Sequence, residues 1–209
     1  MRLAAIVLAK SPRPGHVKTR LCPPCTPTEA SAIAAASLEE TIDAVAGCRH
    51  VRRVIAVDDD VTIPGFETIR QRGEGLAERL AGAFEDVGGP ALLVGMDTPQ
   101  LTSRSLEAAF AALERCDSVI GPTEDGGYWG IGLHGPRFRE LFVDVPMSRP
   151  DTWAHQLRRL HASGLDPVVL PVVRDVDVFD DALAVARLIP DTRFAGLVRA
   201  IARERAPVA

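Results

Sequence analysis

The sequence has no apolar run long enough to cross a membrane. A spanning helix needs about 20 consecutive apolar residues. The N-terminal run at residues 3–9 is too short for a membrane span or a signal-peptide core, and charges interrupt the helical segments further on. We therefore expect a soluble, cytoplasmic protein that has no membrane partner.

The chain as a whole has no excess of positive charge. The chain has 24 lysine and arginine residues against 28 aspartate and glutamate residues, so its formal net charge is −4. Nucleic-acid coats and polybasic membrane anchors depend on a positive field over much of the surface. We therefore expect no nucleic-acid partner, and the cations within residues 10–20 are a local exception that needs an explanation.

Cysteine is sparse as well, with four residues at positions 22, 25, 48 and 116. A chain of 209 residues with 46% hydrophobic content can bury a core without disulfides, which predicts reduced thiols and one domain over residues 1–209. Cys22 and Cys25 form a C-x-x-C pattern, which occurs in redox and zinc sites. Two prolines between them and the lack of a second C-x-x-C favour a rigid loop, with redox or metal binding as the alternative.

Short apolar segments alternate with segments of helical periodicity along the chain. Predicted strands lie at residues 3–8, 51–57, 91–94, 118–120, 129–133 and 168–172. Predicted helices lie at residues 27–46, 75–87, 103–115, about 151–162, and as a pair within 180–205 that Pro190 divides. The first helix has Thr26 as N-cap and Glu29 as its capping-box partner. This alternation predicts an α/β fold, with a mainly parallel sheet covered by helices on both faces and ligands at the carboxyl ends of the strands.

The segment KSPRPGHVKTRL follows the first predicted strand and contains Lys10, Arg13, Lys18 and Arg20. It is not a P-loop, because valine rather than glycine precedes Lys18 and the prolines delay the next helix. It is not a dinucleotide fingerprint, because it contains a single glycine. A loop that binds phosphate with side chains remains, as does a solvated basic loop without a ligand.

Acidic residues follow two other predicted strands. Phosphate chemistry usually requires Mg²⁺ or Mn²⁺, which carboxylates and the phosphates themselves hold. Asp97 comes shortly after the predicted strand at residues 91–94. Since Thr102 or Ser103 can cap the next helix, we favour a metal-ligand role over a capping role. Asp175 and Asp177 point the same way along an extended segment near the C-terminus, and Asp177 can face the first site. Helix capping by this acidic run is the alternative.

A third candidate segment is Asp125-Gly126-Gly127, between two predicted strands. It is typical of a hairpin turn, which alone would explain both glycines. Backbone without side chains would also suit close approach to a ribose or an acceptor.

Four motifs together resemble an uncharacterised bacterial family. They are K-x-P-x-P-G-x-V-K-T-R-L, G-x-D-x-P-x-L, P-x-x-D-G-G-Y-x-x-I-G-L and R-D-V-D, and they span nearly the whole chain in that order. Members of the family are described as glycosyltransferase-like or nucleotidyltransferase-like proteins of the GT-A superfamily. The resemblance implies the Rossmann-like fold of nucleotide-diphospho-sugar transferases. More remotely, the first motif is similar to loops of 2-phospho-lactate guanylyltransferase and the molybdenum-cofactor guanylyltransferases.

The resemblance also implies roles for particular residues. Lys18 and Arg20 would handle the triphosphate, Asp97 would hold the metal, and Asp177 would be its second ligand. The segment QRGEGLAERL resembles the family's Q-x-G-x-x-L-x-x-R stretch, so Gln71 and Arg79 would face the nucleotide. From the basic loop and the glycine turn themselves, we expect further contacts of the nucleotide or substrate with Lys10, Gly15, Asp125, Gly126 and Gly127. The chain departs from the family where the usual D-V-D-T-P-E-D reads D-V-D-V-F-D-D, and where Met-Ser-Arg at residues 147–149 replaces Trp-Ser-Thr.

Two enzymatic functions fit these residues. The first transfers a nucleotidyl group from a nucleoside triphosphate to a small phosphorylated or hydroxylated acceptor and releases pyrophosphate. The second is glycosyl transfer from a nucleotide-sugar, in which Asp125 would contact or deprotonate the acceptor. The basic loop favours the first, because a triphosphate has more charge to neutralise. A non-catalytic nucleotide sensor and a homodimer are options that the sequence leaves open.

Overall fold

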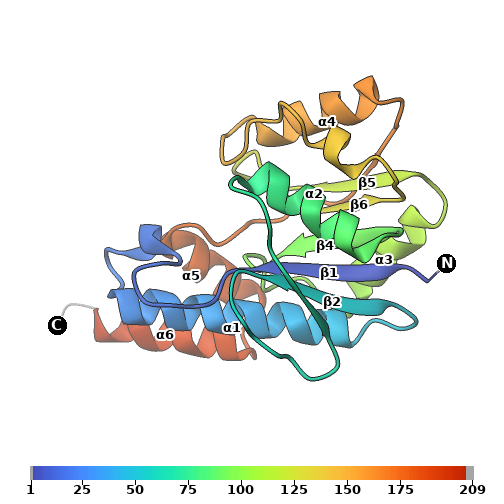
Figure 1. Cartoon of the computed structure of the whole chain (residues 1–209). Coiled ribbons are helices and arrows are strands. Elements are labelled where there is room, and N and C mark those ends of the chain that lie inside the picture. The colour runs from blue at the N-terminus through green and yellow to red at the C-terminus, as the bar shows by residue number, and fades with distance from the viewer. Residues whose placement is uncertain (1, 206–209) are drawn as a thin grey trace.

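The computed structural model describes residues 2–205 and contains one seven-stranded sheet (Figure 1). The strands are β1 (Ala4–Ala9), β2 (Arg52–Val57), β3 (Glu67–Arg70), β4 (Ala91–Gly95), β5 (Ser118–Pro122), β6 (Tyr128–Leu133) and β7 (Val168–Val169). Their order is β3-β2-β1-β4-β6-β5-β7, and β6 alone runs antiparallel to its neighbours. The predicted α/β fold with a mainly parallel sheet is therefore confirmed.

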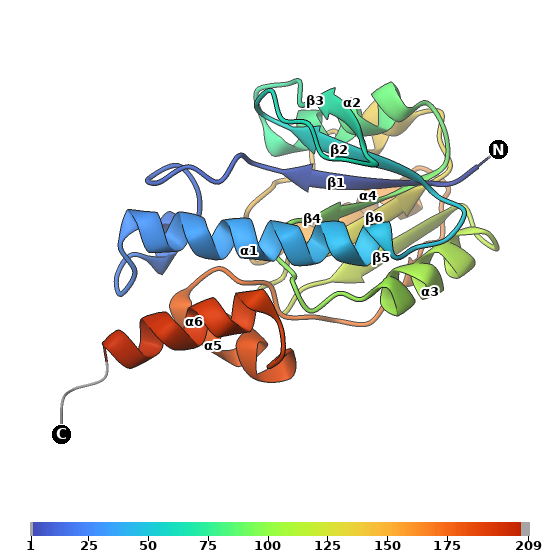
Figure 2. The same ribbon diagram turned by 90° about the horizontal axis from the view of Figure 1, so that it is seen from below.

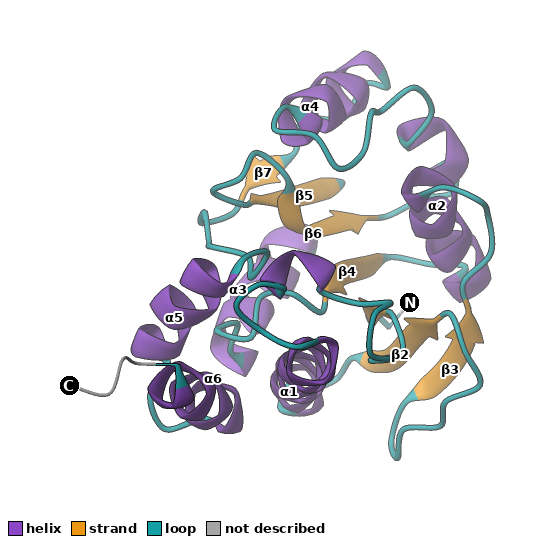
Figure 3. Cartoon of the chain, turned by 90° about the vertical axis from the view of Figure 1, so that its left-hand side faces the viewer, coloured by secondary structure: helices purple, strands orange, loops and turns teal. Residues whose placement is uncertain are grey.

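Helices cover both faces of this sheet (Figure 3). They are α1 (Pro27–Ala46), α2 (Leu76–Val87), α3 (Ser103–Leu113), α4 (Thr152–Ala162), α5 (Phe179–Leu188) and α6 (Arg193–Glu204), with short 3₁₀ turns η1 (Thr19–Leu21) and η2 (Phe138–Leu141). Side chains alternate across β1, so that Ala5 and Val7 pack in the core with α1 and α3, while Ala4 and Ile6 pack in the core with α2.

The last two helices add a further layer on α1, on the side away from the sheet (Figure 2). Ile33 on α1 is completely buried in a third cluster that includes Phe179 of α5 and Phe194 of α6. Val176, in the segment that leads to α5, is 1% exposed and belongs to the same cluster. This packing fixes the position of residues 174–178, which carry the C-terminal acids.

The predicted start of α1 is confirmed in detail. The Glu29 amide donates to Thr26 Oγ1 at 3.3 Å, and the Thr26 amide donates to Glu29 Oε2 at 2.7 Å. These two hydrogen bonds form a capping box, which satisfies two amide groups that have no partner within the helix. Because α1 begins at the loop that contains Lys18 and Arg20, the cap also fixes where that loop ends.

Two strand predictions need correction. Strand β3 was not predicted, because Glu67–Arg70 lies at an edge of the sheet, is largely exposed, and so needs no apolar run. The strand predicted at residues 168–172 covers only Val168–Val169, since Pro171 cannot donate to a ladder and Val172 is exposed.

No helix within residues 2–205 is both long enough and apolar enough to pass through a membrane. The expectation of one domain over residues 1–209 stays a prediction.

Replacing Thr26 with alanine tests the importance of the cap. We expect Thr26→Ala to lower the free energy of unfolding by about 1 kcal/mol, because the Glu29 amide loses its acceptor. The measurement is urea denaturation followed by circular dichroism. Thr28→Ala, the same change on an exposed residue two positions further on, should alter stability by less than about 0.5 kcal/mol. Equal losses in the two variants would contradict the capping role.

Candidate active site

The strand order brings every predicted site segment to one edge of the sheet. All strands except β6 run in the same direction, so the loops after β1, β3, β4, β5 and β7 leave the same edge (Figure 2). The chain passes from β1 through α1 to β2 on one side, while β4 lies on the other side of β1. The carboxyl ends of β1 and β4 therefore flank the point where strand order reverses, which is where open α/β sheets bind ligands.

Lys18 connects the first and central loops of this edge. Its side chain is only 8% exposed, its ammonium lies 2.9 Å from Asp97 Oδ1, and it also donates to the carbonyl oxygen of Val176. The Val176 amide in turn donates to the carbonyl oxygen of Asp97 at 2.9 Å. Segments that follow β1, β4 and β7 thus meet around one ammonium group.

The second predicted cation is also paired with a predicted metal ligand. Arg20 Nη1 lies 2.5 Å from Asp177 Oδ2, in a pair whose side chains are 71% and 38% exposed. The hydrogen bond that Arg20 donates to the Asp177 carboxylate is the main cause that raises the pKa of Arg20, with a smaller contribution from the charge of Asp125. Each predicted metal ligand therefore pairs with one predicted phosphate-binding cation: Asp177 with Arg20, and Asp97 with Lys18.

Asp175 is the acid that sequence reasoning left without a role. Its pKa is raised to about 6, chiefly by burial and then by the charges of Asp125 and Asp97, while a backbone hydrogen bond and the charge of Lys18 act in the opposite direction. Asp175 therefore shares the electrostatic environment of Asp97 and Asp125. The sequence places Asp175 on the same side of its extended segment as Asp177, but the family resemblance implies a role for Asp177 alone.

These acids suit a hard divalent cation without forming a complete cage. Among residues 2–205, no three histidine, cysteine or acidic side chains are arranged to hold a metal ion. Mg²⁺ is usually bound by one or two carboxylates together with substrate phosphates, so a dedicated protein cage is not required. The oxygen donors of Asp97 and Asp177 fit that mode of binding, and the metal-ligand roles of both residues stay predictions.

The Asp125-Gly126-Gly127 turn is the hairpin connection between β5 and β6, as predicted. Asp125 Oδ1 accepts hydrogen bonds from Thr123 Oγ1 at 2.6 Å and from the Gly127 amide at 2.8 Å. Gly126 has a φ of +88°, and a Cβ there would lie 1.8 Å from the Pro150 carbonyl oxygen. The glycine thus has a structural explanation, and contact of this turn with a nucleotide or acceptor stays a prediction.

The remaining predicted residues lie around the same edge or beside it. Gln71 Nε2 donates to the carbonyl oxygens of Ala9 at 2.7 Å and Ala56 at 2.9 Å, and so connects the ends of β1 and β2. Lys10 is exposed directly after β1, and Gly15 is exposed further along the same loop. Arg79 lies in the first turn of α2, where its Nε donates to the Gly73 carbonyl oxygen at 3.2 Å.

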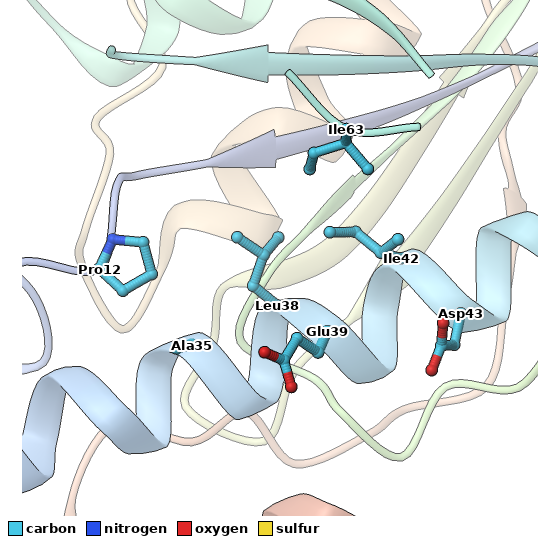
Figure 4. A pocket seen from close by; sticks show the side chains of 7 residues that line it. All are labelled: Pro12, Ala35, Leu38, Glu39, Ile42, Asp43 and Ile63. Carbon is cyan, nitrogen blue, oxygen red and sulfur yellow. The ribbon is translucent and has the colours of Figure 1, made fainter. Parts of the chain in front are cut away.

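Two surface pockets lie outside this group of residues. One, of about 530 Å³, lies beside α1 and is walled by Pro12, Leu38, Ile42 and Ile63, with Glu39 and Asp43 on the helix (Figure 4). The other, of about 670 Å³, is lined by residues between Asp117 and Leu165, including His134 after β6 and Ser163 after α4. Neither is lined by a predicted site residue, so the candidate site is defined by its charged groups and its place on the sheet.

Comparison with known proteins identifies the family. Residues 41–149, just over half of the chain, match the model of the family described as "Uncharacterized protein conserved in bacteria (DUF2064)". The chain belongs to this family. The sequence resemblance to an uncharacterised bacterial family is thereby confirmed.

This DUF2064 member also resembles a protein with a named activity. It is 30% identical over 165 residues to the 2-phospho-L-lactate guanylyltransferase of Methanopyrus kandleri, a match that covers 72% of this chain and 80% of that protein. The expected enzyme class, a transferase, agrees with that name.

Solved structures confirm the predicted fold of the DUF2064 chain. A crystal structure from Desulfovibrio desulfuricans G20, described as a proposed nucleotide-diphospho-sugar transferase, has a TM-score of 0.86 at 23% identity over 97% of both chains. CMP:2-keto-3-deoxy-manno-octonic acid synthetase in complex with CTP has a TM-score of 0.60 at 14% identity and covers 91% of this chain and 99% of its own. Rv0371C from Mycobacterium tuberculosis H37Rv, in complex with manganese, has a TM-score of 0.53 at 16% identity. The match covers 92% of this chain and 100% of Rv0371C.

A glycine substitution tests how tightly the β5–β6 turn is held against the segment before α4. We expect Gly126→Ala to lower the free energy of unfolding by clearly more than about 1 kcal/mol, because the new Cβ would be strained at positive φ and would overlap the Pro150 carbonyl. The matched control is Gly65→Ala, which has a φ of +80° but no atom within 4 Å of the added Cβ. Thermal and urea unfolding of both variants would separate the cost of the positive φ, which both share, from the cost of the overlap with Pro150, which only Gly126→Ala has. Equal losses of unfolding free energy in the two variants would contradict the close approach of Gly126 to Pro150.

Proposed function

We propose that the chain is a metal-dependent nucleotidyltransferase. It would transfer a nucleotidyl group from a nucleoside triphosphate to a small phosphorylated or hydroxylated acceptor and release pyrophosphate. The observation that supports this most directly is the meeting of two cations with two carboxylates, Lys18 with Asp97 and Arg20 with Asp177, at the edge where strand order reverses. The guanylyltransferase name of the relative from Methanopyrus kandleri supports the same reaction class.

Each side chain has a task in this reaction. Lys18 and Arg20 would donate charge-assisted hydrogen bonds to the phosphates and stabilise the charge that develops on the leaving pyrophosphate. Asp97 and Asp177 would hold Mg²⁺ or Mn²⁺, which when bound neutralises phosphate charge and orients the α-phosphate. An acceptor oxygen would form the new bond to the α-phosphorus while the bond to pyrophosphate breaks, so no protein nucleophile is required.

The metal requirement has two sources of support. The carboxylates of Asp97 and Asp177 are 45% and 38% exposed, so an ion could reach them from solvent. A structural neighbour, Rv0371C, was solved in complex with manganese. Both observations fit Mg²⁺ or Mn²⁺ and do not separate the two ions.

Glycosyl transfer from a nucleotide-sugar is the second candidate function. The neighbour from Desulfovibrio desulfuricans G20 is described as a proposed nucleotide-diphospho-sugar transferase, and it covers 97% of the chain. Asp125, whose charge acts on both Asp175 and Arg20, would then contact or deprotonate the acceptor. The two paired cations favour the triphosphate reaction, because a nucleotide-sugar carries one phosphate fewer to neutralise.

We further propose that residues 1–209 act as one cytoplasmic catalytic domain. The expected partners are then a nucleoside triphosphate and a small-molecule acceptor, without nucleic acid or membrane. The net charge of −4 supports the absence of a nucleic-acid partner.

A thermal-shift panel tests the choice of donor. The purified chain is melted with each of the four nucleoside triphosphates and with common nucleotide-sugars, in Mg²⁺, Mn²⁺ or EDTA. We expect one triphosphate with metal to raise the melting temperature, because a ligand at 100 times its Kd stabilises the native state by about 2.7 kcal/mol. Asp97→Asn should abolish this shift by removing the metal ligand.

The matched control is Asp166→Asn, the same change on a side chain that is 97% exposed just before β7, at the opposite edge of the sheet. It should keep the full shift. Stabilisation by a nucleotide-sugar alone would replace nucleotidyl transfer with glycosyl transfer. If no nucleotide stabilises the chain, both functions are wrong.

A further inference from the structure

The cations expected to bind phosphate are already neutralised in the free site. Lys18 donates to Asp97 and to the Val176 carbonyl oxygen, and Arg20 donates to Asp177. The two carboxylates expected to hold the metal are therefore the same groups that neutralise the two cations. A phosphate that enters the site therefore meets cations that already bind carboxylates, and a metal ion meets carboxylates that already bind cations.

The two pairs differ in how strongly they are held. The Arg20–Asp177 pair is largely exposed, and pairs in such positions usually contribute little free energy. The Lys18 side chain is 8% exposed, so its ammonium has lost most of its water and depends on Asp97 and Val176 for compensation. Lys18 is therefore the cation that controls access to Asp97.

We propose that Lys18 occupies the cation position of the free site and that metal and nucleotide enter by an exchange of partners with the Lys18–Asp97 pair. The metal ion binds Asp97 in place of Lys18, and a phosphate binds Lys18 in place of Asp97. This inference rests on the proposed function for the identity of the anion that receives Lys18. The exchange at Asp97 concerns the metal alone.

The exchange makes the two ligands cooperative. A metal ion that binds alone leaves the ammonium of Lys18 without its counter-charge, and a phosphate that binds alone leaves Asp97 without its cation. When both bind, each ligand supplies the partner that the other removes. By linkage, each ligand then raises the affinity of the site for the other by the same factor.

The signal of Lys18 is easy to distinguish by NMR, because the chain has only one other lysine, Lys10. Lys10 lies in the same loop and is exposed, and the structure records no side-chain hydrogen bond or ion pair from it within residues 2–205. Lys10→Met is therefore a matched control for the loss of one positive charge from this loop.

The first test measures Mn²⁺ binding to the full chain without nucleotide, by electron paramagnetic resonance of the free ion. We expect Lys18→Met to bind Mn²⁺ roughly tenfold more tightly than the unmodified chain, a coupling of the size common between linked sites. Lys10→Met should bind less than about threefold more tightly, because an exposed charge is screened by salt. Unchanged or weaker Mn²⁺ binding by Lys18→Met would overturn the proposal.

A second measurement covers the case in which Lys18→Met does not fold. In protein labelled with ¹³C-lysine, two Cε resonances are expected, which Lys10→Arg assigns. Mg²⁺ alone at saturation should shift the Lys18 resonance and leave that of Lys10 in place. Asp97→Asn should shift the Lys18 resonance before any Mg²⁺ is added and remove its response. A Lys18 resonance that Mg²⁺ does not move overturns the exchange.

Neither measurement uses a nucleotide, so failure of the exchange differs from failure of the proposed function. Tight metal binding by Lys18→Met, in a chain that no nucleoside triphosphate stabilises, would support the exchange and refute nucleotidyl transfer. Metal-dependent stabilisation by a triphosphate, with the Lys18 resonance unmoved by Mg²⁺, would support the function and refute the exchange.

Discussion

The ammonium of Lys18 holds together three segments that are far apart in the sequence. It lies between the Asp97 carboxylate and the Val176 carbonyl oxygen, and Val176 donates its amide to the Asp97 backbone. A nearly buried ammonium requires such compensation, because it has lost its hydration. The loop after β1, the loop after β4 and the segment before α5 are therefore set by one charge at the carboxyl edge of the sheet.

Contacts elsewhere in the fold hold the segments that meet at Lys18 in place. The capping box of Thr26 and Glu29 fixes the start of α1, and α1 packs against the cluster of α5 and α6 in which Val176 is buried. Gln71 connects the carboxyl ends of β1 and β2 at the same edge. Most acids and cations of the candidate site belong to loops, but the helices and strands at the ends of these loops hold them in place.

Sequence reasoning predicts the elements whose signals are local. LAAIVLA is recognisable as a buried strand, and T-P-T-E as a helix start, because burial and capping depend on neighbouring residues. ETIR is not recognisable as a strand, since an exposed edge needs no apolar pattern. The pairing of Lys18 with Asp97, and of Arg20 with Asp177 rather than Asp175, depends on packing across the chain, above all on the burial of Val176. The sequence motifs indicate which residues to consider for the candidate site, whereas the pairing of these residues with one another is visible only in the structure.

We propose that nucleotide and metal bind together at the Lys18–Asp97 contact. A crystal structure of the chain with Mn²⁺ and a non-hydrolysable nucleoside triphosphate tests it most directly, since the anomalous signal locates the ion. We expect manganese on Asp97, with the ammonium of Lys18 moved onto a phosphate oxygen. Nucleotide bound elsewhere, or manganese away from Asp97 with Lys18 still paired to that carboxylate, would contradict it.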